Sequence, residues 1–175
     1  MIVVADTGPV IALAKLDRLD VLDIFGAPVA VTPYVRRELL SKPASETKEI
    51  ERALERRIQV RDVPTLGTKT KEVVGRLDPG EREAVALAAA LDEEAVLIMD
   101  DQAGRRVARQ LNCPVTGVIG VLLRAKERGR IDAVTPLLRQ LQEGGYWLSD
   151  EIIEHARELA DETTASSDDP DQEAR

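Results

Sequence analysis

The chain has 175 residues, of which 43% are hydrophobic and 32% are charged, and its formal net charge is -8. This length allows one domain with a sizeable core and is short for two. With one Phe, one Trp and two Tyr, the core must consist mainly of Val, Ile, Leu and Ala, which is typical of buried strands covered by helices. The composition therefore predicts an α/β domain.

The sequence gives no sign of secretion or of a membrane span. The single cysteine, Cys113, cannot form an internal disulfide, and Met1 is followed directly by an apolar segment without the charged region of a signal peptide. The longest apolar run, residues 84–91, falls well short of the roughly 20 residues that a membrane helix needs. We expect a cytoplasmic protein that does not enter a membrane.

The negative charge is concentrated at the C-terminus. Residues 160–175 contain six acidic side chains and one arginine, which accounts for -5 and leaves -3 for the rest of the chain. This segment has few apolar groups to bury, so we expect it to be a disordered acidic tail. The predicted domain organisation is a folded domain at 1–159 followed by the tail at 160–175.

The first third of the chain predicts strands alternating with helices. Residues 2–5 are an apolar, largely β-branched run, and a helical pattern follows the turn Asp6-Thr7-Gly8-Pro9. Asp17 is expected to cap a short second helix. Residues 28–31 predict the next strand, and Thr32-Pro33 predicts the start of the helix after it.

Residues 42–77 give a weaker pattern. They contain a charged helical segment at 46–57, an alternating segment at 58–63 and a turn rich in Pro, Gly and Thr at 64–70. We expect the most variable part of the architecture here.

The pattern becomes clear again at Asp78, which with Glu81 has the spacing of a capping box before a helix that is apolar on nearly all sides. Residues 95–99 predict a buried strand that ends at Asp100-Asp101. The remaining elements are expected to be a helix from Gln102 with Ala103, Val107 and Leu111 inward, a strand at 114–116, and helices at 118–129, 131–142 and 149–159. This alternation predicts parallel strands joined by right-handed crossovers.

Acidic residues follow two of the predicted strands. Asp6 comes after the first strand and Asp100-Asp101 after the fourth, so they should meet at the carboxyl edge of the sheet. Glu38 and Glu83 lie on the second turns of helices that could pack across this edge. Several close carboxylates repel one another unless a cation neutralises them, and a set of oxygen ligands favours Mg²⁺ or Mn²⁺. The chemistry that fits is hydrolysis of a phosphodiester.

Each acid also has a purely structural interpretation. Asp6 could cap the first helix, and Glu38 could pair with Lys42 one turn along its helix. For Glu81 we favour the capping-box role over a catalytic one. Of the pair Asp100-Asp101, one residue could cap the following helix while the other binds metal.

Several other enzyme classes do not fit this sequence. A phosphoacceptor receiver domain would have its acid pair after the first strand, and a haloacid-type phosphatase would have Asp-x-Asp there. His155 is the only histidine, so neither a Ser-His-Asp nor a Cys-His arrangement is credible, and a zinc site lacks ligands.

Four motifs together resemble the prokaryotic PIN domain over about residues 2–159. They are Asp6-Thr7-Gly8-Pro9, Tyr34-Val35-Arg36-Arg37-Glu38-Leu39, Gly80-Glu81-Arg82-Glu83-Ala84 and Leu97-Ile98-Met99-Asp100-Asp101. Within the family, the chain is similar to a branch of uncharacterised, toxin-related proteins. Two departures are Gly8, where many PIN domains have Ser, and a longer segment between Glu38 and Glu83.

The resemblance implies a Rossmann-like three-layer α/β/α sandwich with a central, mainly parallel sheet. The family's four acids, which serve catalysis and metal binding, fall on Asp6, Glu38, Glu83 and Asp101, with Asp100 as second choice for the metal. The implied activity is Mg²⁺- or Mn²⁺-dependent endoribonuclease cleavage of single-stranded or structured RNA. The implied protein partners are a second copy in a homodimer and a small antitoxin that holds a toxin inactive.

Two expectations complete this interpretation. Basic residues near the acids could contact RNA phosphate through salt-sensitive, sequence-independent contacts. They are Lys15, Arg105, Arg106 and Arg109. The alternative function is that of a catalytically silent PIN-like module that binds or regulates within a larger complex.

Overall fold

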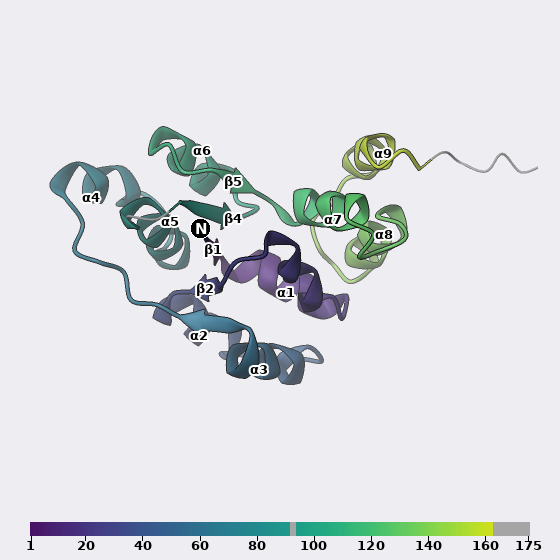
Figure 1. Ribbon diagram of the computed structural model, residues 1–175, viewed down its shortest axis with the longest axis horizontal. Helices are drawn as coiled ribbons and strands as arrows, with labels where there is room; N and C mark the ends of the chain where they lie inside the picture. The colour runs from purple at the N-terminus through teal and green to yellow at the C-terminus, as the bar shows by residue number, and fades with distance from the viewer. Residues whose placement is uncertain (92–93, 163–175) are drawn as a thin grey trace, which may run out of the picture.

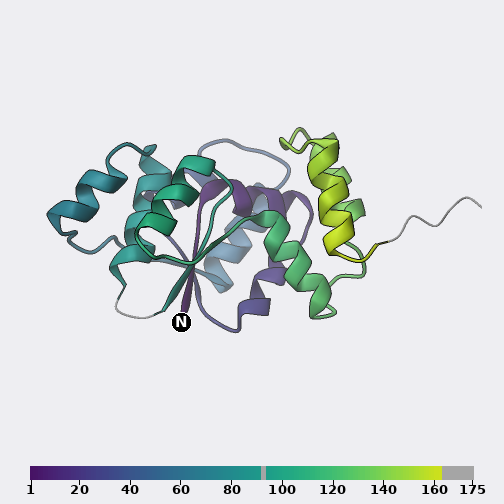
Figure 2. The ribbon, with the colours of Figure 1, turned by 90° about the horizontal axis from the view of Figure 1, so that it is seen from above.

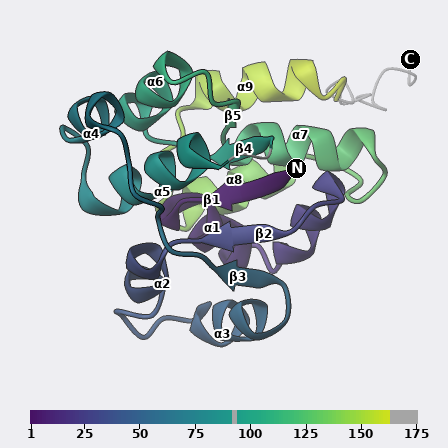
Figure 3. The same cartoon turned by 60° about the vertical axis from the view of Figure 1, so that its left-hand side comes forward.

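The computed structural model describes residues 1–91 and 94–162. Five parallel strands form one sheet in the order β3-β2-β1-β4-β5, and Figure 3 shows the strands stacked in this order. The strands are β1 Ile2–Ala5, β2 Val29–Val31, β3 Ile58–Val60, β4 Ala95–Ile98 and β5 Val115–Thr116. The sequence prediction of a parallel α/β fold is confirmed.

Side chains of the strands alternate between two cores because successive residues of a strand point to opposite faces. On one face Val3, Ala5 and Ile98 belong to a large cluster, and on the other face Val4 and Leu97 belong to a smaller one. The central strands β1 and β4 are therefore buried on both sides. This explains why they consist almost entirely of apolar residues.

Helices cover both faces of the sheet and make three layers (Figure 1). The larger cluster includes side chains from α1 Thr7–Lys15, the 3-10 helix η1 Leu19–Phe25, α2 Pro33–Leu39, α3 Thr47–Arg56, α7 Val118–Glu127, α8 Thr135–Glu143 and α9 Asp150–Leu159. The smaller cluster includes side chains from α4 Thr68–Val74, α5 Pro79–Ala90 and α6 Gln102–Gln110. Figure 2 shows α7 and α9 at one end of the molecule and α4 at the other.

The structure corrects three local expectations. Asp17 does not cap η1: it has a left-handed φ of 55° just after the C-cap of α1, and Arg18 precedes η1. Ala103 is exposed on α6, which buries Gly104 and Ala108 instead. The turn expected at 64–70 ends in the first residues of α4, a helix that was not predicted.

The ordered chain extends past the expected domain boundary at residue 159. Glu162 accepts hydrogen bonds from the amides of Val134 at 2.6 Å and Thr135 at 2.9 Å, and Lys126 lies 2.9 Å from the same carboxylate. These contacts hold the chain after α9 against the start of α8. The rest of the predicted acidic tail, residues 163–175, lies outside the described residues. Within the described ranges, no helix has the length and apolar character needed to span a membrane.

Candidate active site

The carboxyl ends of β1 and β4 form a crevice at the centre of the sheet. Asp6 directly follows β1, and its amide donates a 3.0 Å hydrogen bond to the carbonyl of Ile98 at the end of β4. From β1 the sheet continues to β2 on one side and to β4 on the other. Ligands of open parallel sheets bind at such a switch point, and Asp6 lies at its floor.

Asp6 is buried among other acids. It is only 8% exposed and makes no capping hydrogen bond to α1, so the simple helix-cap interpretation does not account for it. Burial raises the pKa of Asp6 to about 6; a backbone hydrogen bond from Thr7 opposes this shift, and the charges of Glu38, Asp100 and Asp101 add to it. The negative charges of these three neighbouring acids therefore all act on Asp6.

Glu38 approaches the crevice from α2. The hydroxyl of Thr7 donates a 2.6 Å hydrogen bond to Glu38 Oε2, which ties α2 to the first turn of α1. The carboxylate packs so closely against α5 that a Cβ at Gly80 would lie 2.7 Å from Oε2. Thr32, which was predicted as the helix cap, accepts the amide of Val35 and so fixes the start of α2.

Asp100 and Asp101 have different surroundings, although both follow β4. The two oxygens of Asp100 are each engaged, one by the amide of Val118 at 2.9 Å and the other by the hydroxyl of Tyr146 at 2.5 Å. Asp101 is exposed, and its Oδ1 caps α6 by accepting the amide of Gly104 at 2.8 Å. The described hydrogen bonds thus use one oxygen of Asp101 and both oxygens of Asp100.

The structure brings Glu81 to the crevice. Glu81 lines the same cavity as Asp6 and Glu38. Burial raises the pKa of Glu81 to about 7, the charges of Asp101 and Asp6 contribute to the increase, and a backbone hydrogen bond from Asp78 opposes it. That bond is one half of the predicted capping box, so Glu81 has both the structural position that we expected and a place in the acid cluster.

Glu83 lies elsewhere. Its Oε2 accepts the amide of Tyr34 at 3.3 Å, at the start of α2. Residues two apart on a helix point in nearly opposite directions, because each residue turns the helix by about 100°. Glu81 and Glu83 therefore point in different directions, and of the two only Glu81 lines the cavity that contains Asp6 and Glu38. From the sequence, Glu83 was expected in the acid site and Glu81 in the capping box.

A cavity of about 550 Å³ opens beside Asp6, Glu38 and Glu81. Lys15 and Lys42 are among its lining residues, so cationic side chains reach its rim. A neighbouring cavity of about 750 Å³ contains Asp100, Asp101 and Arg105. Arg105 donates a 3.2 Å hydrogen bond to the carbonyl of Met99. Of the other predicted RNA contacts, Arg106 and Arg109 are exposed on α6.

The donor set suits a hard divalent cation. It consists of carboxylate oxygens, which Mg²⁺ and Mn²⁺ prefer. Burial and the charges of neighbouring carboxylates raise the pKa values of Asp6 and Glu81, and a bound cation would offset both effects. Among residues 1–91 and 94–162, no three metal-ligating side chains lie close enough together to hold one ion. Binding would therefore need changes in side-chain rotamers, for which the cavity leaves room.

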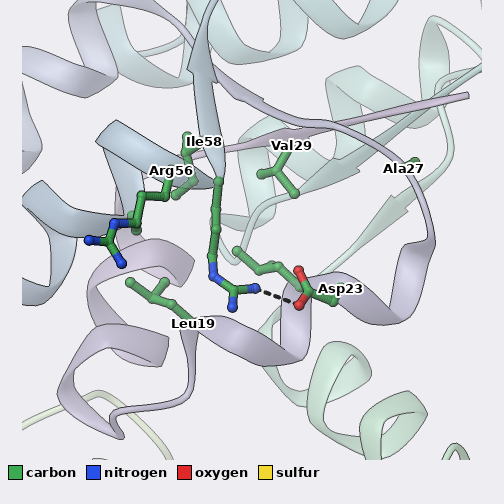
Figure 4. A pocket seen from close by; sticks show the side chains of 9 residues that line it. Leu19, Asp23, Ala27, Val29, Arg56 and Ile58 are labelled. Carbon is green, nitrogen blue, oxygen red and sulfur yellow. Dashed lines mark hydrogen bonds and ion pairs between the residues drawn. The ribbon is translucent and has the colours of Figure 1, made fainter.

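A further cavity of about 420 Å³ lies at the opposite edge of the sheet, near the amino ends of β2 and β3 (Figure 4). Its walls include Leu19, Arg56 and Ile58, and an ion pair between Arg57 and Asp23 crosses it. It contains a single acid, already paired with arginine. This cavity therefore lacks the carboxylate cluster found at the other edge.

A parallel sheet between two helical layers, with clustered acids at its switch point, defines a Rossmann-like α/β protein with a nuclease-type fold. The family model DUF3368, described as a PIN domain, matches residues 2–162, and the chain belongs to this family. The resemblance recognised from the sequence motifs is confirmed. PIN domains are generally metal-dependent nucleases.

The similarity of this chain to individual proteins is lower. A solved structure described as the PIN domain endonuclease Utp24 is 13% identical, and the match covers 67% of this chain and 84% of that chain with a TM-score of 0.44. No curated protein sequence matches the chain.

Proposed function

We propose that this protein is a metal-dependent endoribonuclease that hydrolyses phosphodiester bonds of RNA. The observation that carries the proposal is the convergence of Asp6, Glu38, Glu81 and Asp101 at the switch point of the sheet, with the pKa of Asp6 at about 6 and that of Glu81 at about 7. Structural ion pairs do not account for these acids, because burial and then the charges of other carboxylates raise both pKa values.

The chain's residues have distinct parts in this proposal. Asp6, Glu38, Glu81 and Asp101 would hold Mg²⁺ or Mn²⁺, and such an ion, when bound, supplies positive charge that activates water and stabilises the phosphate. Thr7 fixes one oxygen of Glu38 and the amide of Gly104 fixes one oxygen of Asp101. Each of these carboxylates therefore has one oxygen held by the protein.

Two of the acids that the sequence predicted for the site are assigned different roles. Asp100, with both oxygens engaged, positions the turn after β4 and Tyr146. Glu83 holds the start of α2 against α5. Glu81 replaces Glu83 as the third acid of the proposed set.

The first test is cleavage of a mixed RNA pool by the purified protein with Mg²⁺, with Mn²⁺ and with EDTA. Asp6→Asn should abolish cleavage, whereas Lys69→Gln, on the surface of α4, should cleave like the unmodified chain. Binding of Mn²⁺ measured by electron paramagnetic resonance gives a second readout, and Asp6→Asn should weaken it. Equal cleavage by the unmodified chain and Asp6→Asn would favour a catalytically silent binding module.

The resemblance to the toxin-related branch extends the proposal to biology. We propose that the nuclease acts as the toxin of a toxin-antitoxin pair and forms a homodimer. Induced expression should arrest growth through Asp6-dependent RNA cleavage, and light scattering of the purified chain should give twice its 19.2 kDa mass. Growth that is unaffected by the active enzyme would contradict the toxin role, and a monomeric mass would contradict the homodimer.

A further inference from the structure

The only tryptophan in the sequence lies beside the acid crevice and is almost fully exposed. Trp147 is 97% exposed, more than any other large hydrophobic side chain among the described residues. Burying an aromatic ring of this size contributes more free energy than burying almost any other side chain. An unpacked tryptophan at a fixed place therefore suggests a ligand that covers it.

The backbone around Trp147 is held on both sides. The preceding residue, Tyr146, donates its hydroxyl to Asp100 and its amide to the carbonyl of Leu141. The carbonyl of the following residue, Leu148, accepts the side-chain amide of Gln142 at 2.9 Å. The exposure of Trp147 is thus not the exposure of a loosely attached loop, because both neighbours are tied to the fold.

Trp147 shares a cavity with Asp100 and Asp101. Asp100, Asp101 and Arg105 line the cavity of about 750 Å³ on the side of β4 and α6, and Trp147 lies in the wall formed by the loop between α8 and α9. Ile119, Leu148 and Ile152 supply apolar surface to the same cavity. One space therefore has an aromatic and aliphatic wall, an arginine and the edge of the proposed metal site.

This combination matches the chemistry of an unpaired nucleotide. Proteins bind single-stranded nucleic acid by stacking bases on aromatic rings while cationic side chains contact the phosphates. The bases of a duplex are already stacked and paired, so they are not free to stack on a protein ring. An arginine in the same cavity as the ring and two carboxylates would favour a phosphate there, next to where hydrolysis would occur.

We infer that Trp147 stacks on an unpaired base of a single-stranded RNA substrate and that Arg105 contacts the adjoining phosphate, so that the strand is directed into the acid crevice. This inference deepens the proposed ribonuclease function and rests on it. Of the two RNA classes expected from the sequence, it selects single strands or the unpaired loops of structured RNA. No sequence motif around Trp147 predicted this role.

Because Trp147 is the sole tryptophan, its fluorescence reports on this site alone. The full chain is titrated with a single-stranded RNA octamer in Ca²⁺, and in parallel in EDTA, with the RNA checked by gel for integrity. An octamer of the same length made of abasic residues and a blunt RNA duplex are the matched ligands. Anisotropy of end-labelled strands measures affinity independently of tryptophan emission.

The base-bearing single strand should quench Trp147 emission, whereas the abasic strand and the duplex should not. Trp147→Leu should bind the single strand about tenfold more weakly and the abasic strand with unchanged affinity, as expected from the loss of one base stack. Trp147→Phe should restore most of the affinity. Leu159→Ala, at an exposed apolar residue of α9 outside this cavity, should bind like the unmodified chain.

Several outcomes would overturn the inference. They are equal quenching by the abasic strand, unchanged affinity in Trp147→Leu, and no binding of any strand; a protein partner would then be the better explanation of the exposed ring. Cleavage of RNA without base-dependent quenching would contradict the stacking site but support the ribonuclease function. Base-dependent quenching without cleavage would remove the ribonuclease and leave a binding site for single strands.

Discussion

The hydroxyl of Tyr146 donates a 2.5 Å hydrogen bond to Oδ2 of Asp100, which joins the loop after α8 to the end of β4. Burial, and then the charge of Asp100, raise the pKa of Tyr146 above its ordinary value. The phenol therefore remains a neutral donor at physiological pH. The loop that carries Trp147 is consequently positioned by the same turn that carries the acids.

Removing this hydrogen bond should destabilise the protein measurably. Tyr146→Phe leaves Asp100 with the amide of Val118 as its remaining described donor, and loss of a hydrogen bond to a charged group costs about 1.5–3 kcal/mol. Urea denaturation of Tyr146→Phe, Asp100→Asn and the double variant measures the coupling between the two residues. Strictly additive effects would show that the bond contributes nothing to stability.

The third acid of the site can be identified by comparing two neighbouring variants. Glu81→Gln should reduce RNA cleavage by about a hundredfold, because the proposed metal site would lose one of its carboxylates. Glu83→Gln should reduce it by less than about tenfold and act mainly on stability, because Glu83 accepts the amide of Tyr34. Initial cleavage rates of both variants, each checked for fold by circular dichroism, decide the matter. The opposite order would return Glu83 to the site.

Burial of Asp6 should make stability depend on pH in a definite direction. Its pKa rises from 3.8 to about 6 on folding, so between these pH values the folded state binds more protons than the unfolded state. Stability from this group is fully present below about pH 4 and is lost as pH rises through about 6. The loss is at most about 3 kcal/mol, at 1.36 kcal/mol for each pKa unit.

Denaturation of the unmodified chain and Asp6→Asn at pH 5 and pH 8 tests this linkage. In EDTA, the unfolding free energy of the variant relative to that of the unmodified chain should increase from pH 5 to pH 8, because Asn carries no charge to bury. Adding Mg²⁺ at pH 8 should stabilise the unmodified chain and leave the variant unchanged. A stability difference that is independent of pH would contradict the raised pKa.

Gly80 should matter for activity more than for stability. A Cβ there would lie 2.7 Å from Oε2 of Glu38, and the flexible carboxylate, rather than the backbone, would have to move. Alanine is intrinsically favoured over glycine in helices by about 1 kcal/mol, so Gly80→Ala should unfold at a similar or higher denaturant concentration. A displaced carboxylate should lower cleavage by about ten- to a hundredfold. Gly67→Ala, whose Cβ would meet nothing within 4 Å, is the matched control and should keep full activity.

The end of the folded domain can be located by truncation. Burial raises the pKa of Glu162, but hydrogen bonds from Thr135, Val134 and Lys126 prevail and lower it to about 2. A chain ending at residue 162 should therefore be as stable as the full chain. One ending at residue 159 should lose about 2–3 kcal/mol of unfolding free energy, because buried amides at the start of α8 lose their acceptor. Equal stability of the two truncated chains would place the boundary at 159.

Much of the fold could be predicted because local signals and tertiary structure agree. The apolar run at Ile2–Ala5, the cap at Thr32 and the apolar α5 each indicated the element that forms. The short α4 escaped prediction because its seven residues bury only Val74 and show little hydrophobic periodicity. Ala103 was placed inward because small residues give a weak signal, and the neighbouring Gly104 and Ala108 are the ones that α6 buries.

The site was predictable where strands determine it and less so where helices do. Asp6 and the Asp100-Asp101 pair follow adjacent strands, so their meeting follows from the parallel topology. The choice between Glu81 and Glu83 depends on the rotation of α5 about its axis, which motif spacing does not reveal. Their near-opposite directions on the helix were a usable signal that the two side chains would have different partners. The contact of Tyr146 with Asp100, 46 residues apart, has no local signal at all.

The central position of β1 also affects when the protein can become active during synthesis. Val3 of β1 pairs with Val96 of β4, 93 residues later in the chain, and pairings this distant form slowly because closing a long loop costs entropy. Asp6 and Glu38 leave the ribosome well before Glu81 and Asp101. A nascent or truncated chain that lacks β4 also lacks Asp101 and carries three of the four proposed acids, so the proposed site would stay incomplete until the sheet has closed.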